Sequence, residues 1–189
     1  MNESENYYIN LSPEKLREEF DQLRRRVLEQ TERETKERIR NNPQPTEQEI
    51  FMGAFREEIE PQIRDAVDEL YKKGYTTGSS GFHGSASEQQ ILYIKGEVDN
   101  QTKTALESIG NIKVFPEKLP IFLEDQPRRR KVTLIKFMAP VPELKNIKAM
   151  WDTIADIFPP KEVPDQLLEE KRRRHREIIN ETIRKFSQG

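Results

Sequence analysis

The fold is decided by residues 90–115, which read QILYIKGEVDNQTKTALESIGNIKVF. Side chains alternate along Gln90–Val98, which is typical of a β-strand. Asp99 is placed to cap a short helix that Gly110 ends, and Ile112–Phe115 has the composition of a second strand. Such a strand–helix–strand unit crosses over with a right hand and leaves its two strands parallel.

The segments on either side extend this unit into a sheet. Tyr75–Ser80 and Val132–Met138 are predicted strands, so that each strand of the unit gains an antiparallel neighbour. Leu144–Phe158 is the clearest amphipathic helix of the chain, because its apolar residues recur every three or four positions. Over residues 61–158 the expected order is αββαββα. We therefore expect an α+β, ferredoxin-like sandwich with helices over one face of a twisted sheet.

Long helices are expected outside this core. Ser12 and Pro13 have the pattern of a helix start, and the helix carries a narrow apolar stripe suited to one partner helix. A last helix is expected from Pro164 to Phe186, with a highly charged middle, residues 169–176, that offers no buried face. The stripe of the first helix consists of Leu16, Phe20, Leu23 and Val27.

Another helix is predicted between the first arm and the sheet. Residues 46–49 have the spacing of a capping box, with Thr46 as the cap. The apolar pattern then continues to Gly74, with Pro61 either kinking the helix or starting a new one. We divide the chain into an N-terminal helical arm (1–60), an α+β core (61–158) and a C-terminal basic helix (159–189).

Composition excludes several classes of protein. Only 33% of the 189 residues are hydrophobic and 35% are charged, so part of the chain must be solvated helix. The absence of cysteine rules out disulfides, thiolate metal sites and cysteine nucleophiles. No apolar run of about 20 residues exists, and residues 1–10 have no signal-like pattern. We expect a cytoplasmic protein with no membrane partner.

The net charge of −2 is distributed unevenly along the chain. Residues 1–60 sum to −5, residues 61–127 to −3 and residues 128–189 to +6. The acidic and basic thirds can attract each other within one chain or between two chains. The basic third can alternatively bind phosphate.

The segment from Gly74 to Gly84 contains four of the eight glycines and one of the two histidines. Glycine allows a left-handed turn or the close approach of a ligand. Its spacing is neither that of a dinucleotide fingerprint nor that of a P-loop. Backbone N–H groups of such a turn could still hold an anion, or the turn could merely connect two elements. The candidate ligand-binding residues are Ser79, Ser80, Gly81 and His83, within a glycine-rich turn over residues 78–84.

A basic cluster precedes the last predicted strand. Residues 119–130 are expected to form an irregular, proline-bearing loop, and Arg128, Arg129 and Arg130 at its end are candidate ligand-binding residues that could flank the glycine-rich turn. A nucleic-acid surface would add exposed aromatic rings to such a cluster. Tyr93 and Phe137 lie on predicted strands, but the pattern leaves their direction open. The alternative is a solvated surface with local ion pairs.

Other residues offer no chemistry. The two histidines, His83 and His175, are far apart in sequence, so a histidine-based metal site is not expected. No Asp-x-Asp pattern indicates a magnesium site. Trp151 falls on the apolar stripe of its helix and is expected in the core. We expect neither a bound metal nor a cofactor.

A short resemblance accompanies the glycine-rich segment. Leu70–Gly81, with its Gly-Tyr-Thr-Thr-Gly-Ser-Ser-Gly run, resembles a family of small uncharacterised bacterial proteins that share a Gly-Tyr-x-Thr-x-Ser-Ser-Gly turn. It is more distantly similar to the wybutosine-synthesis tRNA methyltransferase family, which implies an S-adenosylmethionine-using RNA enzyme. Only Ser79 and Ser80 align with that family's motif. Gly81 and Phe82 follow the serines here, without the family's cysteine or arginine.

Two functions remain open. No catalytic constellation is present, which favours a non-enzymatic interaction module that binds a protein partner or itself through its terminal helices. The alternative is a nucleotide- or RNA-binding protein, related to RNA modification, that uses the turn at 78–84 and the basic cluster at 128–131.

Overall fold

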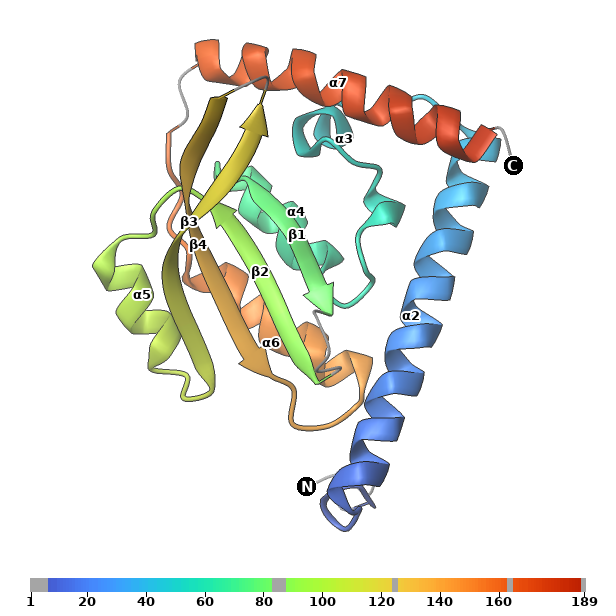
Figure 1. Ribbon diagram of the computed structural model, residues 1–189, viewed down its shortest axis with the longest axis vertical. Helices are drawn as coiled ribbons and strands as arrows, with labels where there is room; N and C mark the ends of the chain where they lie inside the picture. The colour runs from blue at the N-terminus through green and yellow to red at the C-terminus, as the bar shows by residue number, and fades with distance from the viewer. Residues whose placement is uncertain (1–6, 83–87, 124–125, 163–164, 188–189) are drawn as a thin grey trace.

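The computed structural model describes residues 7–82, 88–123, 126–162 and 165–187. Its elements follow one another as helices, then strands and helices, then two further helices (Figure 1). The helices are α2 (Pro13–Asn41), α3 (Glu47–Met52), the 3-10 helix η1 (Arg56–Glu58), α4 (Arg64–Lys72), α5 (Asn100–Glu107), α6 (Leu144–Ile157) and α7 (Asp165–Ser187). The strands are β1 (Thr77–Phe82), β2 (Gln89–Lys95), β3 (Ile112–Leu123) and β4 (Gln126–Met138).

The described strands form one antiparallel sheet in the order β1-β2-β4-β3. Both β2 and β3 run antiparallel to β4. The two strands joined by α5 are therefore parallel to each other, as predicted, with β4 inserted between them. The chain from α4 to α6 also has the predicted order of elements. The protein is thus a mixed α+β structure built on an antiparallel sheet.

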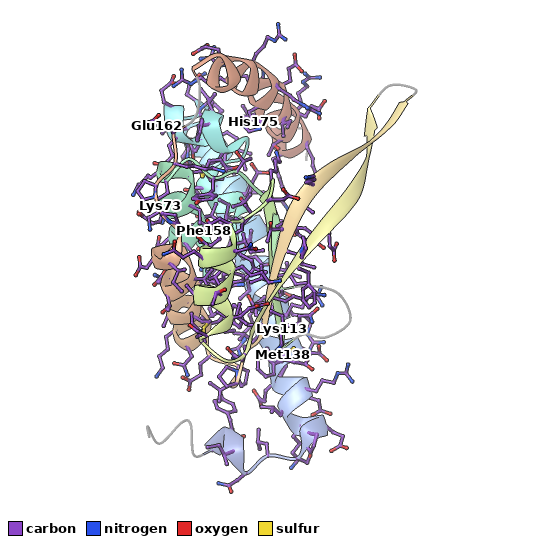
Figure 2. All side chains as sticks on the ribbon, turned by 90° about the vertical axis from the view of Figure 1, so that its left-hand side faces the viewer. Lys73, Lys113, Met138, Phe158, Glu162 and His175 are labelled. Carbon is purple, nitrogen blue, oxygen red and sulfur yellow. The ribbon has the colours of Figure 1, made fainter. Side chains whose placement is uncertain are left out.

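Helices cover one face of the sheet, as the sequence predicted. Figure 2 looks at the sheet from its β3 edge, and α4, α5 and α6 lie on the left of the strands. On this side Ile135 and Phe137 of β4 are buried, and Trp151 of α6 packs edge-on against Phe137 with ring centroids 4.8 Å apart. Trp151 has no exposed surface, which confirms its predicted place in the core.

The predicted irregular loop at residues 119–130 is wrong. Both flanks of residues 124–125 are strands, and β3 pairs with β4 from Ile112–Phe137 to Leu123–Gln126. Prolines led to the wrong interpretation, because proline donates no hydrogen bond to a sheet. Pro116 and Pro120 are tolerated because β3 is an edge strand.

The predicted continuous helix from residue 47 to residue 74 is interrupted early. The capping box at Thr46 is confirmed, but α3 ends after six residues because Gly53 takes a left-handed conformation with φ +79°. Eleven residues, including η1, separate α3 from α4. The prediction placed the break at Pro61, whereas the first interruption is at Gly53. Gly74 ends α4 with φ +83°, as predicted.

The terminal helices pack against the rest of the chain. Ser12 caps α2 as predicted, and its residues Phe20, Leu23 and Val27 are buried in the same cluster as the core helices. A second cluster joins three elements through Ile39 of α2, Ile50 of α3 and Ile179 of α7. The expectation that residues 169–176 bury nothing is wrong, because His175 is only 5% exposed against α3. The division into three domains remains a prediction.

Candidate functional site

The glycine-rich segment is mostly strand. Residues 78–82 belong to β1, which corrects the predicted turn, because β2 supplies a full antiparallel partner. Ser80 pairs with Leu92 and Gly81 with Ile91, after an irregularity between Thr77 and Ser80. Ser79 and Ser80 are described by their backbone alone, and His83 lies outside the described residues.

A carboxylate covers Gly81. Glu60, on the segment between η1 and α4, accepts a hydrogen bond from the Phe82 N–H at 2.9 Å and one from the Gln62 amide at 2.5 Å. A Cβ on Gly81 would lie 2.2 Å from Glu60 Oε2, and Gly81 itself has φ +111°. The glycine is therefore explained by this contact and by the backbone conformation. The same space cannot hold a ligand while Glu60 occupies it.

A small cavity lies beside the same strand. It measures about 210 Å³ and is lined by α3–η1, α4 and β1. Ligand-binding pockets usually span roughly 300–1,000 Å³, so this cavity is too small to enclose a nucleotide. Its lining residues are Met52, Gly53, Ala54, Ile59, Val67, Tyr71, Thr77 and Gly78.

Replacing Glu60 with glutamine should stabilise the protein at neutral pH. Burial raises the pKa of the Glu60 carboxyl, against the opposing hydrogen bonds from Phe82 and Gln62 and the charge of Arg24. The folded state therefore favours the protonated acid. The stability that this preference contributes is complete below the pKa of an unfolded glutamate, about 4.3, and is lost as pH rises through the raised pKa.

The measurement is the melting temperature of Glu60→Gln and wild type from pH 4 to pH 8. The variant should melt higher at pH 7, and the difference should vanish at the acidic end. Glu32→Gln is the control with the opposite sign, because its hydrogen bond from Lys36 lowers the pKa of the exposed Glu32. A Glu60→Gln variant that melts lower than wild type at pH 7 would contradict this account.

The candidate arginines lie far from the glycine-rich segment. In the register of the sheet, Gly81 pairs with Ile91, and Ile91 pairs with Lys136. Arg130 is six residues before Lys136 on β4, and a strand rises about 3.3 Å per residue, so the two sites are about 20 Å apart along the strands. The structure therefore does not bring residues 128–130 next to Gly81. It places them opposite Leu119, Pro120 and Ile121 of β3.

The sheet has one face that no helix covers, and we call it the open face. In Figure 2 it lies to the right of the strands, on the side opposite α4, α5 and α6. Phe115 and Met138 are 42% and 43% exposed on it. Its described members are Tyr93 and Lys95 of β2, Lys113 and Phe115 of β3, and Lys136 and Met138 of β4.

Cations surround the aromatic ring of Phe115 on the open face. Lys136 places its ammonium 5.1 Å from the centroid of the ring, a distance typical of a cation–π contact. Lys113 is exposed and pairs in register with Lys136. The open face therefore combines a partly exposed ring with neighbouring positive charges.

The β3–β4 hairpin continues past the open face. β2 stops pairing at Lys95, opposite Val132, and β3 and β4 go on alone. We call residues 117–131 the hairpin arm, and Figure 2 shows it projecting away from the sheet and helices. Residues 112–138 contain seven basic and three acidic residues, a net charge of +4 in a chain of −2. Within the arm, Lys131 forms an ion pair with Glu97 at 2.9 Å.

The open face answers the question about the two aromatic residues. Phe137 is 2% exposed on the helix-covered face, whereas Tyr93 is half-buried on the open face. Sequence reasoning missed Phe115, Lys113 and Lys136. The signal was available: polar or charged residues alternate with Ile112 and Val114 along the same strand, which marks Lys113 and Phe115 as members of one face.

The described residues contain no group of three or more histidine or acidic side chains placed to hold a metal ion. In the same part of the chain, no helix combines the length and the apolar character needed to cross a membrane. Comparisons of the chain with models of protein families, with curated proteins and with solved structures returned no match. The resemblance at residues 70–81 stays a prediction, and function must be argued from the open face and the hairpin arm.

Proposed function

We propose that the protein is a non-enzymatic nucleic-acid-binding module whose binding surface is the open face together with the hairpin arm. The observation that carries this proposal is the position of Lys113 and Lys136 around the partly exposed Phe115, on the one sheet face without helices. The same two strands continue into an arm that contains three consecutive arginines.

Phosphate attraction is the physical basis of the proposal. Lysine and arginine side chains that neutralise phosphates release condensed counterions, and this release supplies much of the affinity for nucleic acid. The rest of the chain carries a net charge of −6, since residues 112–138 carry +4 of a total of −2. A polyanion would therefore be directed to the hairpin and repelled elsewhere.

The sheet order supports a ferredoxin-like description of the core. β2, α5, β3 and β4 form a split βαβ unit, because β4 lies between the parallel strands β2 and β3. The fourth strand, β1, precedes this unit in the chain and pairs with β2. We propose a ferredoxin-like sandwich in which the edge strand comes first in the sequence rather than last.

Self-association through the terminal helices has lost the observation that motivated it. Phe20, Leu23 and Val27 of the α2 stripe are buried in their own chain and are not free to bind a second α2. The glycine-rich segment is likewise occupied by Glu60. These contacts favour the open face over the helices and over residues 78–82 as the binding surface.

Fluorescence anisotropy with a labelled RNA oligonucleotide, titrated at several salt concentrations, tests the proposal. Wild type should bind with an affinity that falls as salt rises. Lys113→Glu combined with Lys136→Glu should weaken binding at least about tenfold and flatten the salt dependence by about 0.7 per lost phosphate contact. Arg129→Glu should act in the same direction through the hairpin arm.

A charge-matched control separates a binding surface from net charge. Lys72 and Lys145 have side chains 65% and 62% exposed on α4 and at the start of α6, on the other side of the sheet. Changing both to glutamate alters the net charge by the same amount as the open-face pair. The control should bind nearly as wild type does. Equal losses in both double variants, or no binding by wild type at low salt, would overturn the proposal.

A further inference from the structure

We infer that the ligand of the open face is a single-stranded nucleic acid whose bases stack on Phe115. This inference rests on the proposed function and narrows it, because phosphate attraction alone does not distinguish single strands from duplexes. The additional observation is an aromatic ring that a base can reach: Phe115 is 42% exposed although its register partner Leu134 is 3% exposed. The ring therefore stands at the surface of a sheet whose next residue is covered.

The surroundings of Phe115 suit a nucleotide as a whole. Leu134 lies between Phe115 on one side and Tyr93 on the other, so the two aromatic residues are two strands apart, about 10 Å. Lys136 and Lys113 are the next pair along β4 and β3. A base over Phe115 would thus place its sugar–phosphate within reach of two ammonium groups. Base–aromatic stacking is tolerant of sequence, because every base has a π-face.

The shape of the open face disfavours a duplex. Bases within a duplex are stacked on one another and present only their edges in the grooves. A sheet surface can reach base faces only where they are unstacked, as in single strands and loops. The competing arrangement is the hairpin arm inserted into a major groove, which admits a two-stranded ribbon. That arrangement would use the arm and leave Phe115 without a role.

Three labelled probes of about ten nucleotides separate these arrangements: an oligoadenylate, an abasic strand with the same phosphates, and a duplex. Phe115→Ala should weaken binding of the oligoadenylate roughly 5- to 150-fold, the range expected for one stacked base. The same variant should bind the abasic strand as wild type does. Wild type should prefer the oligoadenylate to the duplex.

Two further variants control for shape and surface loss. Met138→Ala removes an equally exposed apolar side chain from the same face and should leave affinity nearly unchanged. Phe115→Tyr keeps a ring and should retain affinity even if Phe115→Ala disturbs the strand. A Phe115→Ala variant that binds the oligoadenylate like wild type, or a duplex bound at least as tightly as the single strand, would overturn the inference and leave the proposed function standing. If none of the three probes binds at low salt, both proposals fall, and a protein partner of the open face becomes the next candidate.

Discussion

Replacing Trp151 with alanine should lower the free energy of unfolding by about 3–5 kcal/mol, the usual cost of deleting a buried aromatic side chain. Trp151 has no exposed surface and packs against Phe137. Its indole N–H also donates to the Gln90 side-chain oxygen at 3.2 Å, and Gln90 is fully buried. The alanine variant would thus leave both a cavity and an amide without its donor. Denaturant unfolding followed by far-ultraviolet circular dichroism is the measurement, because the chain has no other tryptophan to report by fluorescence.

Two variants separate the packing from the hydrogen bond. Trp151→Phe keeps a ring and removes the donor, so its cost should lie well below that of alanine. Adding Gln90→Met to Trp151→Phe removes both partners of the bond, which is usually cheaper than leaving one partner unsatisfied in the core. The double variant should therefore be at least as stable as Trp151→Phe alone. A cost for Trp151→Ala of less than about 1 kcal/mol would contradict the packing described for α6 and the sheet.

Replacing Gly53 with alanine should destabilise the protein by about 2–4 kcal/mol through two separate effects. An L-residue in the left-handed conformation that Gly53 adopts, with φ +79°, costs about 1–2 kcal/mol. The new Cβ would also lie 2.8 Å from the His175 ring. His175 donates from Nδ1 to the Phe51 carbonyl oxygen at 2.9 Å, so a displaced ring would lose a buried hydrogen bond that fixes α7 on α3.

Gly110→Ala is the matched control for this prediction. Gly110 has φ +101°, and a Cβ there would meet nothing within 4 Å. It should therefore show the backbone cost alone, and the difference between the two variants measures the contact with His175. The comparison needs only thermal or denaturant unfolding of both proteins. Equal destabilisation by the two substitutions would mean that the His175 ring moves aside without loss.

The sequence was most informative where local chemistry and packing agree. The cap at Ser12, the capping box at Thr46 and the stripe of α6 each depend on residues within one or two turns, and each is present in the structure. The order of elements from α4 to α6 followed from the strand–helix–strand unit at residues 90–115. The position of β4 between β2 and β3 could not be read in the same way, because it depends on pairing between distant segments.

The candidate site was harder to predict because its residues come from three strands. Ser79–Gly81 and Arg128–Arg130 were grouped as a site from glycine content and charge, yet the register separates them along the sheet. The open face needs the knowledge that Lys113, Phe115 and Lys136 share one side, which follows only after β3 is paired with β4. His175 was missed for a similar reason: its environment is a helix more than 120 positions away in sequence.

The prolines of the hairpin bear on the solubility of the protein. Beyond Lys95, both strands of the arm have an edge without a neighbouring strand. Long exposed edges are templates for edge-to-edge polymerisation, and proline interrupts them because it lacks an N–H donor. Pro116 and Pro120 lie on β3 and Pro127 lies on β4, so each edge of the hairpin carries at least one such interruption. The arm can thus extend into solvent with less tendency to recruit a second hairpin into a growing sheet.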